Sequence, residues 1–73
     1  MPLQTYASFC AEMTVFPDRT ADVQGRYNVR SDAARVALDQ AWQARFNAHP
    51  ETKAEWLQLV AHYREWLQRQ PRA

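Results

Sequence analysis

The segment from Pro50 to Gln70 constrains the fold most, because large apolar side chains recur there at helical spacing. On a helical wheel they cover about half of the circumference, and polar side chains cover the rest. In order across this arc, the apolar residues are Trp66, Leu59, Tyr63, Trp56, Leu67, Val60 and Leu57. We therefore predict a helix over 50–69 that must be covered by two elements of its own fold or by a second molecule.

The chain length predicts a single helical domain over 1–73, because 73 residues lie near the lower limit for one core without covalent or metal cross-links. Cys10 is the only cysteine, so an internal disulfide is excluded. A hydrophobic share of 47% predicts a folded chain, and a net charge of +1 does not indicate a generally polyanion-binding surface. Without a long apolar run or a signal-peptide pattern, we expect a cytoplasmic protein that does not bind membranes.

Apolar spacing predicts a first helix over 3–14. Its apolar positions are Leu3, Tyr6, Ala7, Phe9, Cys10 and Met13. Pro17 disfavours helical backbone at Phe16, so this helix should end shortly before that residue. The pattern from 15 to 31 is weak, and we interpret it as a connector that contains one helical turn. Gly25, the only glycine, is expected to provide a positive φ there.

A second helix is predicted over 32–46, where Ser31 is a favourable N-cap residue. Its apolar stripe has a bulky flank at Trp42 and Phe46 and a smooth side made of three alanines. These are Ala34, Ala37 and Ala41, and their small size would let another helix approach closely. Pro50 stops this helix at the preceding residue and suits the first turn of the next one.

Together these segments predict an all-α, small three-helix domain. The second and third helices would form an antiparallel helical hairpin, because their connection is short, and the N-terminal helix would cover it. The predicted parts are helices over 3–14, 32–46 and 50–69, a connector over 15–31 and a frayed tail over 70–73.

The predicted hairpin brings Trp42 and Phe46 of the second helix against Trp56 or Leu57 of the third. Two covering helices would leave one edge of the third helix open. We predict that this edge binds a partner through Trp66, Leu59, Tyr63 and Arg64. For the aromatic residues of this set, packing in the core is the competing interpretation.

A second candidate surface is a series of arginines with an interleaved aromatic residue, which resembles a nucleic-acid contact. Its residues are Arg26, Tyr27, Arg30 and Arg35. Four arginines (26, 30, 35 and 45) against two aspartates (32 and 39) give a net charge of +2 between Arg26 and Phe46. The competing interpretation is that these arginines are solvated or paired with the aspartates. Convergence on one face without acidic neighbours would favour nucleic-acid binding.

No catalytic, cofactor or metal site is predicted. The two histidines, His49 and His62, cannot supply the three protein ligands of a hydrolytic zinc site. One glycine cannot build a phosphate-binding loop. Cys10 lies on the apolar side of its helix, where a cysteine acts as a small core residue. The chain is therefore not expected to be an enzyme.

These observations predict a non-enzymatic protein-binding module that acts stoichiometrically as an inhibitor, adaptor or assembly subunit. Homodimer formation is one form of this function, and a small nucleic-acid-binding regulator is the alternative. Eight arginines against the single Lys53 suggest a GC-rich bacterial or phage genome. The chain generally resembles the small helical proteins of bacteria and phages that occupy or assemble larger machines, although no motif assigns it to a family.

Overall fold

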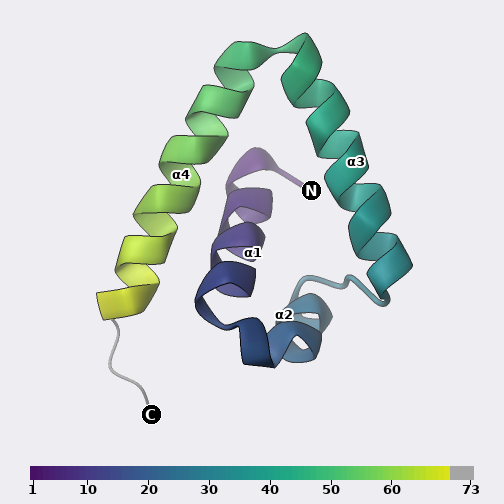
Figure 1. Cartoon of the computed structure of the whole chain (residues 1–73), viewed down its shortest axis with the longest axis vertical. Helices are drawn as coiled ribbons and strands as arrows, with labels where there is room; N and C mark the ends of the chain where they lie inside the picture. Colours follow the sequence, from purple (N-terminus) through teal and green to yellow (C-terminus); the bar gives the residue numbers. More distant parts are fainter. Residues whose placement is uncertain (70–73) are drawn as a thin grey trace.

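The computed structural model describes residues 1–69, and every regular element in this range is helical (Figure 1). The elements are α1 (Leu3–Val15), the short 3-10 helix η1 (Pro17–Arg19), α2 (Thr20–Arg26), α3 (Asp32–Ala48) and α4 (Pro50–Arg69). The all-α prediction is confirmed. The predicted frayed tail, 70–73, lies outside the described residues.

The three-helix prediction is wrong, because the predicted connector over 15–31 contains η1 and the seven-residue helix α2. Val23 of α2 is fully buried in the hydrophobic core, and Val29 after it is also buried. Burial of these side chains stabilises a segment whose own helical pattern is weak. The expectation for Gly25 is also wrong: it lies within α2, and Asn28 adopts the left-handed conformation with a φ of 61°.

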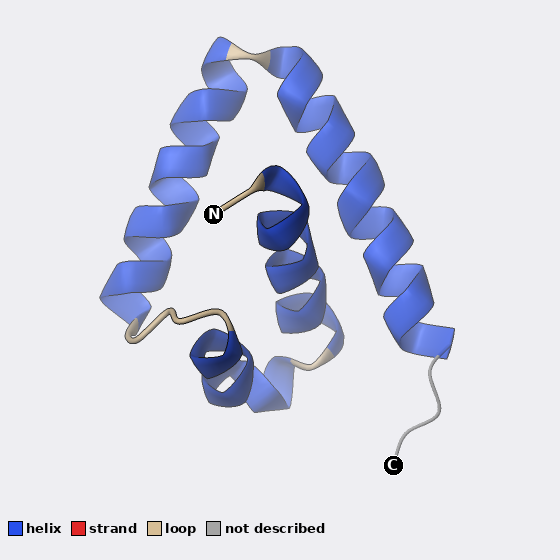
Figure 2. Cartoon of the chain, turned by 180° about the vertical axis from the view of Figure 1, so that it is seen from behind, coloured by secondary structure: helices blue, strands red, loops and turns tan. Residues whose placement is uncertain are grey.

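The predicted packing order is also wrong, since α1 packs mainly on α4. Helices α3 and α4 meet at their connection and then diverge, so that they form a V (Figure 1). Seen from behind, α1 and α2 lie on the near side of this V (Figure 2). The N-terminal helix is therefore one half of the main helix pair, and it does not merely cover a closely packed hairpin.

The small side chains that allow another helix to approach closely lie on α1, whereas the corresponding alanine face of α3 is exposed. Ala7 and Ala11 of α1 are fully buried. The three alanines expected to form the contact surface of α3 are exposed; they are Ala34, Ala37 and Ala41. Residues with small side chains let helix backbones come close wherever the fold brings them together. Helical periodicity could not distinguish between these two alanine faces.

Aromatic rings from three helices form the centre of the core. The Tyr6 ring stacks on Trp42, with centroids 5.1 Å apart, and on Trp56 at 5.9 Å. Phe46 lies 5.0 Å from Trp56, so the predicted contact between the second and third helices is confirmed through Trp56. Leu57, the other predicted partner, is 52% exposed. The Tyr6 hydroxyl also donates a hydrogen bond to Asp39 Oδ1 at 2.8 Å, which ties α1 to α3.

Ser31 caps α3 as predicted, since its Oγ accepts a hydrogen bond from the backbone N–H of Ala34 at 3.1 Å. At the other end, His49 leaves the helical conformation before Pro50 begins α4. Both boundaries therefore follow from local chemistry.

We expect Cys10 to react slowly with iodoacetamide in the folded protein at neutral pH. Burial raises the pKa of the Cys10 thiol to about 11, and only the thiolate is nucleophilic. The alkylation rate followed by mass spectrometry should rise with a midpoint near pH 11 in the native protein. The same protein unfolded in urea should show a midpoint near pH 8.5, the ordinary value for cysteine.

The raised pKa of the Cys10 thiol also makes the stability of the fold depend on pH. The native thiol holds its proton more tightly than the unfolded one, so its contribution is complete below about pH 8.5. That contribution is lost as pH rises through the native pKa of about 11. Equal alkylation midpoints for native and unfolded protein would contradict the burial of this thiol.

Candidate functional site

A groove of about 440 Å³ lies between α1, the end of α2 and the second half of α4. Its lining residues are Ser8, Glu12, Arg26, His62, Tyr63, Trp66 and Leu67. Residues from three helices therefore meet here, although the chain separates the first from the last by most of its length. This groove is the candidate functional site.

A buried carboxylate forms the polar part of the groove. Glu12 is only 7% exposed, and its Oε1 lies 2.6 Å from Nη2 of Arg26. The Tyr27 hydroxyl donates a hydrogen bond to the other oxygen, Oε2. The Ser8 hydroxyl lies 2.7 Å from the Tyr27 hydroxyl and shares a hydrogen bond with it. A charge buried to this extent is tolerated because it is both paired and hydrogen-bonded.

Local structure explains how this network is placed. Ser8 and Glu12 are four residues apart on α1, so they share one face of the helix. Helix α2 ends at Arg26, which puts Arg26 and Tyr27 together opposite that face. The Tyr27 ring meets the Phe9 ring edge-on, with centroids 5.3 Å apart. Burial, together with the hydrogen bond to Glu12, raises the pKa of the Tyr27 hydroxyl above its ordinary value.

The opposite wall of the groove is mostly apolar and comes from α4. Tyr63, Trp66 and Leu67 are spaced three and four residues apart, so they lie on one face of this helix. Tyr63 and Leu67 are half-buried, whereas Trp66 is 54% exposed. The His62 ring lies 5.8 Å from the Tyr63 ring. The wall therefore presents aromatic surface next to an ion pair.

The structure brings together residues from the two surfaces that the sequence treats as alternatives. Trp66 and Tyr63 of the predicted partner-binding edge line the groove with Arg26 of the predicted nucleic-acid surface. Leu59 is half-buried and Arg64 is exposed, and neither lines this groove.

Four groove residues were not singled out as site residues from the sequence: Ser8, Glu12, His62 and Leu67. The sequence places these residues on helices, but nothing near Glu12 indicates that its carboxylate is buried.

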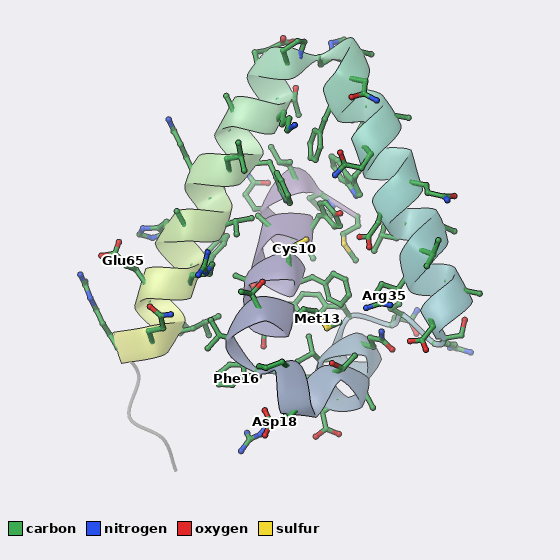
Figure 3. All side chains as sticks on the ribbon, in the orientation of Figure 1. Cys10, Met13, Phe16, Asp18, Arg35 and Glu65 are labelled. Atoms are coloured by element: carbon green, nitrogen blue, oxygen red, sulfur yellow. The ribbon has the colours of Figure 1, made fainter. Side chains whose placement is uncertain are left out.

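The arginines of the second candidate surface do not form one free basic face. Arg26 is paired with Glu12, and Arg30 Nε donates a hydrogen bond to Asn28 Oδ1 at 3.2 Å. Arg35 is half-buried, and Figure 3 shows it directed from α3 toward the middle of the molecule. Arg45 lies over the Trp42 ring, with its guanidinium carbon 5.2 Å from the centroid. Arg26 therefore has an acidic neighbour, and Arg30 and Arg45 have separate local contacts. The condition that would favour nucleic-acid binding, a shared face without acidic neighbours, is not met.

Within residues 1–69, no three histidine, cysteine, aspartate or glutamate side chains are grouped so that they could hold a metal ion. No helix in the same range combines the length and apolarity needed to cross a bilayer.

For recognition of another molecule, the groove offers an aromatic wall, an exposed arginine and a buried carboxylate. No protein-family model, curated protein or solved structure matches this chain.

Proposed function

We propose that this chain is a non-enzymatic module that binds another protein stoichiometrically through the groove between α1, α2 and α4. The observation that carries this proposal is the position of Trp66, which is 54% exposed at the wall of a formed groove. Arg26 and Tyr63 line the same groove. Tryptophan, arginine and tyrosine are the residue types that most often dominate the energy of protein interfaces.

The shape of the fold supports this proposal. The Cα positions span 40 × 26 × 16 Å, so the molecule is thin along its shortest axis. None of the residues of α4 is fully buried, and Trp66 at the wall of the groove is 54% exposed. A thin fold leaves much of each helix accessible, and a partner that fills the groove would bury apolar surface of α4 which the chain itself leaves in water.

An inhibitor, an adaptor and an assembly subunit all fit this description, and so does a homodimer. The proposal includes a cytoplasmic location and a bacterial or phage origin, as expected from the sequence. The alkaline pKa of Cys10 and the ion pairing of Glu12 support a structural role for these two groups.

Nucleic-acid binding receives less support. A phosphate contact gains affinity when cationic side chains neutralise several phosphates together. Here Arg26 is the one arginine or lysine that lines the groove, and Arg35 is half-buried on α3. Binding to DNA or RNA that weakens steeply between about 50 and 200 mM salt would favour this alternative.

Site-specific photo-crosslinking in cells of the source organism tests the proposal. A photoreactive phenylalanine analogue in place of His62 would sit at the groove, and the same analogue at the exposed Gln43 of α3 is the matched control. We expect one discrete crosslinked protein from position 62 and none from position 43. A crosslinked product of twice 8.6 kDa would identify a homodimer. Equal or absent crosslinking from both positions would contradict the proposal.

A further inference from the structure

Arg26 is anchored at its head while most of its side chain remains accessible. Its Nη2 lies 2.6 Å from Glu12 Oε1, yet the Arg26 side chain is 61% exposed and that of Glu12 only 9%. A guanidinium group carries five N–H donors in a rigid plane, so one ion pair does not use its whole hydrogen-bonding capacity. The arginine can therefore receive a second acceptor from outside.

The anchor itself is held by further contacts. Glu12 accepts a hydrogen bond from Tyr27, which in turn bonds to Ser8 and packs edge-on against Phe9. This network limits the positions that the Arg26 head can adopt. A partner group that binds a pre-oriented side chain loses less conformational entropy than one that must order a mobile side chain.

The charges around the groove select the sign of the incoming group. The carboxylate of Glu12 is buried, whereas the side chain of Arg26, its ion-pair partner, is mostly exposed. The accessible ionic group is therefore a cation that can donate hydrogen bonds. The apolar wall of Tyr63, Trp66 and Leu67 lies within the same groove. A segment that fills the groove therefore needs a carboxylate to pair with Arg26 and an apolar side chain to pack against this wall.

We propose that the groove binds an acidic segment of a partner protein, with a carboxylate on Arg26 and a neighbouring apolar side chain against Trp66. This inference rests on the proposed protein-binding function and adds the chemistry of the partner. A planar arginine fork matches a carboxylate in a bidentate geometry. Nucleic acid fits less well, because Arg26 is the only arginine or lysine among the groove's lining residues.

The test is a selection of random 12-residue peptides displayed on phage, with the complete purified chain as the target. We expect the enriched peptides to share an aspartate or glutamate next to an aromatic or large aliphatic residue. A synthetic version of the strongest peptide should bind Arg26→Gln about tenfold more weakly or worse, because a charge-assisted hydrogen bond is lost. Arg26→Lys keeps the charge but loses the planar guanidinium, so its affinity for the peptide should lie between that of the wild-type chain and that of Arg26→Gln.

Arg69→Gln is the matched control, since Arg69 is also an exposed arginine paired with a glutamate, Glu65. It does not line the groove, and Glu65 points away from α1 (Figure 3). Peptide affinity should be unchanged in this variant. Circular dichroism of each variant separates lost binding from lost folding, and Arg26→Lys keeps the test valid if Arg26→Gln unfolds.

Other results would overturn the inference in distinguishable ways. Enriched peptides without acidic residues, or equal affinity for Arg26→Gln, would remove the acidic specificity and leave protein binding intact. A dimer in light scattering that dissociates in Arg26→Gln would assign the groove to a second copy of the chain. Tighter binding to a single-stranded oligonucleotide than to any peptide would assign it to nucleic acid. A wild-type chain that enriches no peptide over Trp66→Ala would contradict the proposed function itself.

Discussion

Replacing Phe46 with alanine is expected to leave the protein largely unfolded at room temperature. The Phe46 ring is only 1% exposed and lies against Tyr6, Trp42 and Trp56, with centroids 6.5, 5.7 and 5.0 Å away. Truncation of a buried phenylalanine to alanine typically costs about 3–5 kcal/mol. A core of this size rarely supplies more than about 3–5 kcal/mol in total. Urea unfolding followed by circular dichroism at 222 nm would measure the loss.

Leu57→Ala is the control for this experiment, because it removes a large apolar side chain that is 52% exposed. Its effect on the free energy of unfolding should stay within about 0.5 kcal/mol. A Phe46→Ala protein that unfolds at the wild-type urea midpoint would show that the aromatic cluster does not hold α1, α3 and α4 together.

In contrast to Phe46→Ala, replacing Trp66 with alanine should leave the protein folded but remove its binding to a partner. Because the Trp66 side chain is 54% exposed, its removal should change the free energy of unfolding by less than about 1 kcal/mol. At an interface, loss of a central tryptophan commonly costs about 2–4 kcal/mol, which corresponds to a roughly 30- to 1000-fold weaker affinity. Isothermal titration calorimetry with a peptide that the wild-type chain binds would measure this loss.

Leu57 again provides the matched control, since it is exposed to a similar extent on α4 but does not line the groove. Leu57→Ala should bind the peptide as the wild-type chain does. If Trp66→Ala unfolds, the indole contributes to the core and the proposed interface loses its central residue. If it folds and binds normally, a partner does not use this wall of the groove.

Much of the helical structure could be predicted, because its causes lie within a few residues. The spacing around Tyr6 and Phe9, the cap at Ser31 and the stop before Pro50 all act locally. Helix α2 could not be predicted from such signals. Its seven residues are too few for a stable isolated helix, and contacts with the rest of the fold hold it, among them the burial of Val23 in the core and the ion pair of Arg26 with Glu12.

The candidate site was predictable only in part. The wheel of α4 places Trp66 and Tyr63 on its apolar arc, and both line the groove. The same wheel could not show which edge of the arc a neighbour covers, so it included Leu59 and Arg64, which do not line the groove. Arg26 was assigned to a different surface because its partner, Glu12, lies on another helix.

Helical periodicity and the capping residues therefore determined an all-α chain with long amphipathic helices, because these signals depend on neighbours within about one helical turn. Only the tertiary structure decided which alanine face is buried, how far α3 and α4 diverge, and that Glu12 meets Tyr27 across 15 residues of sequence. The physical reason is that helices with similar apolar faces have several possible partners. The choice among these partners depends on how all the side chains fill the common core at once.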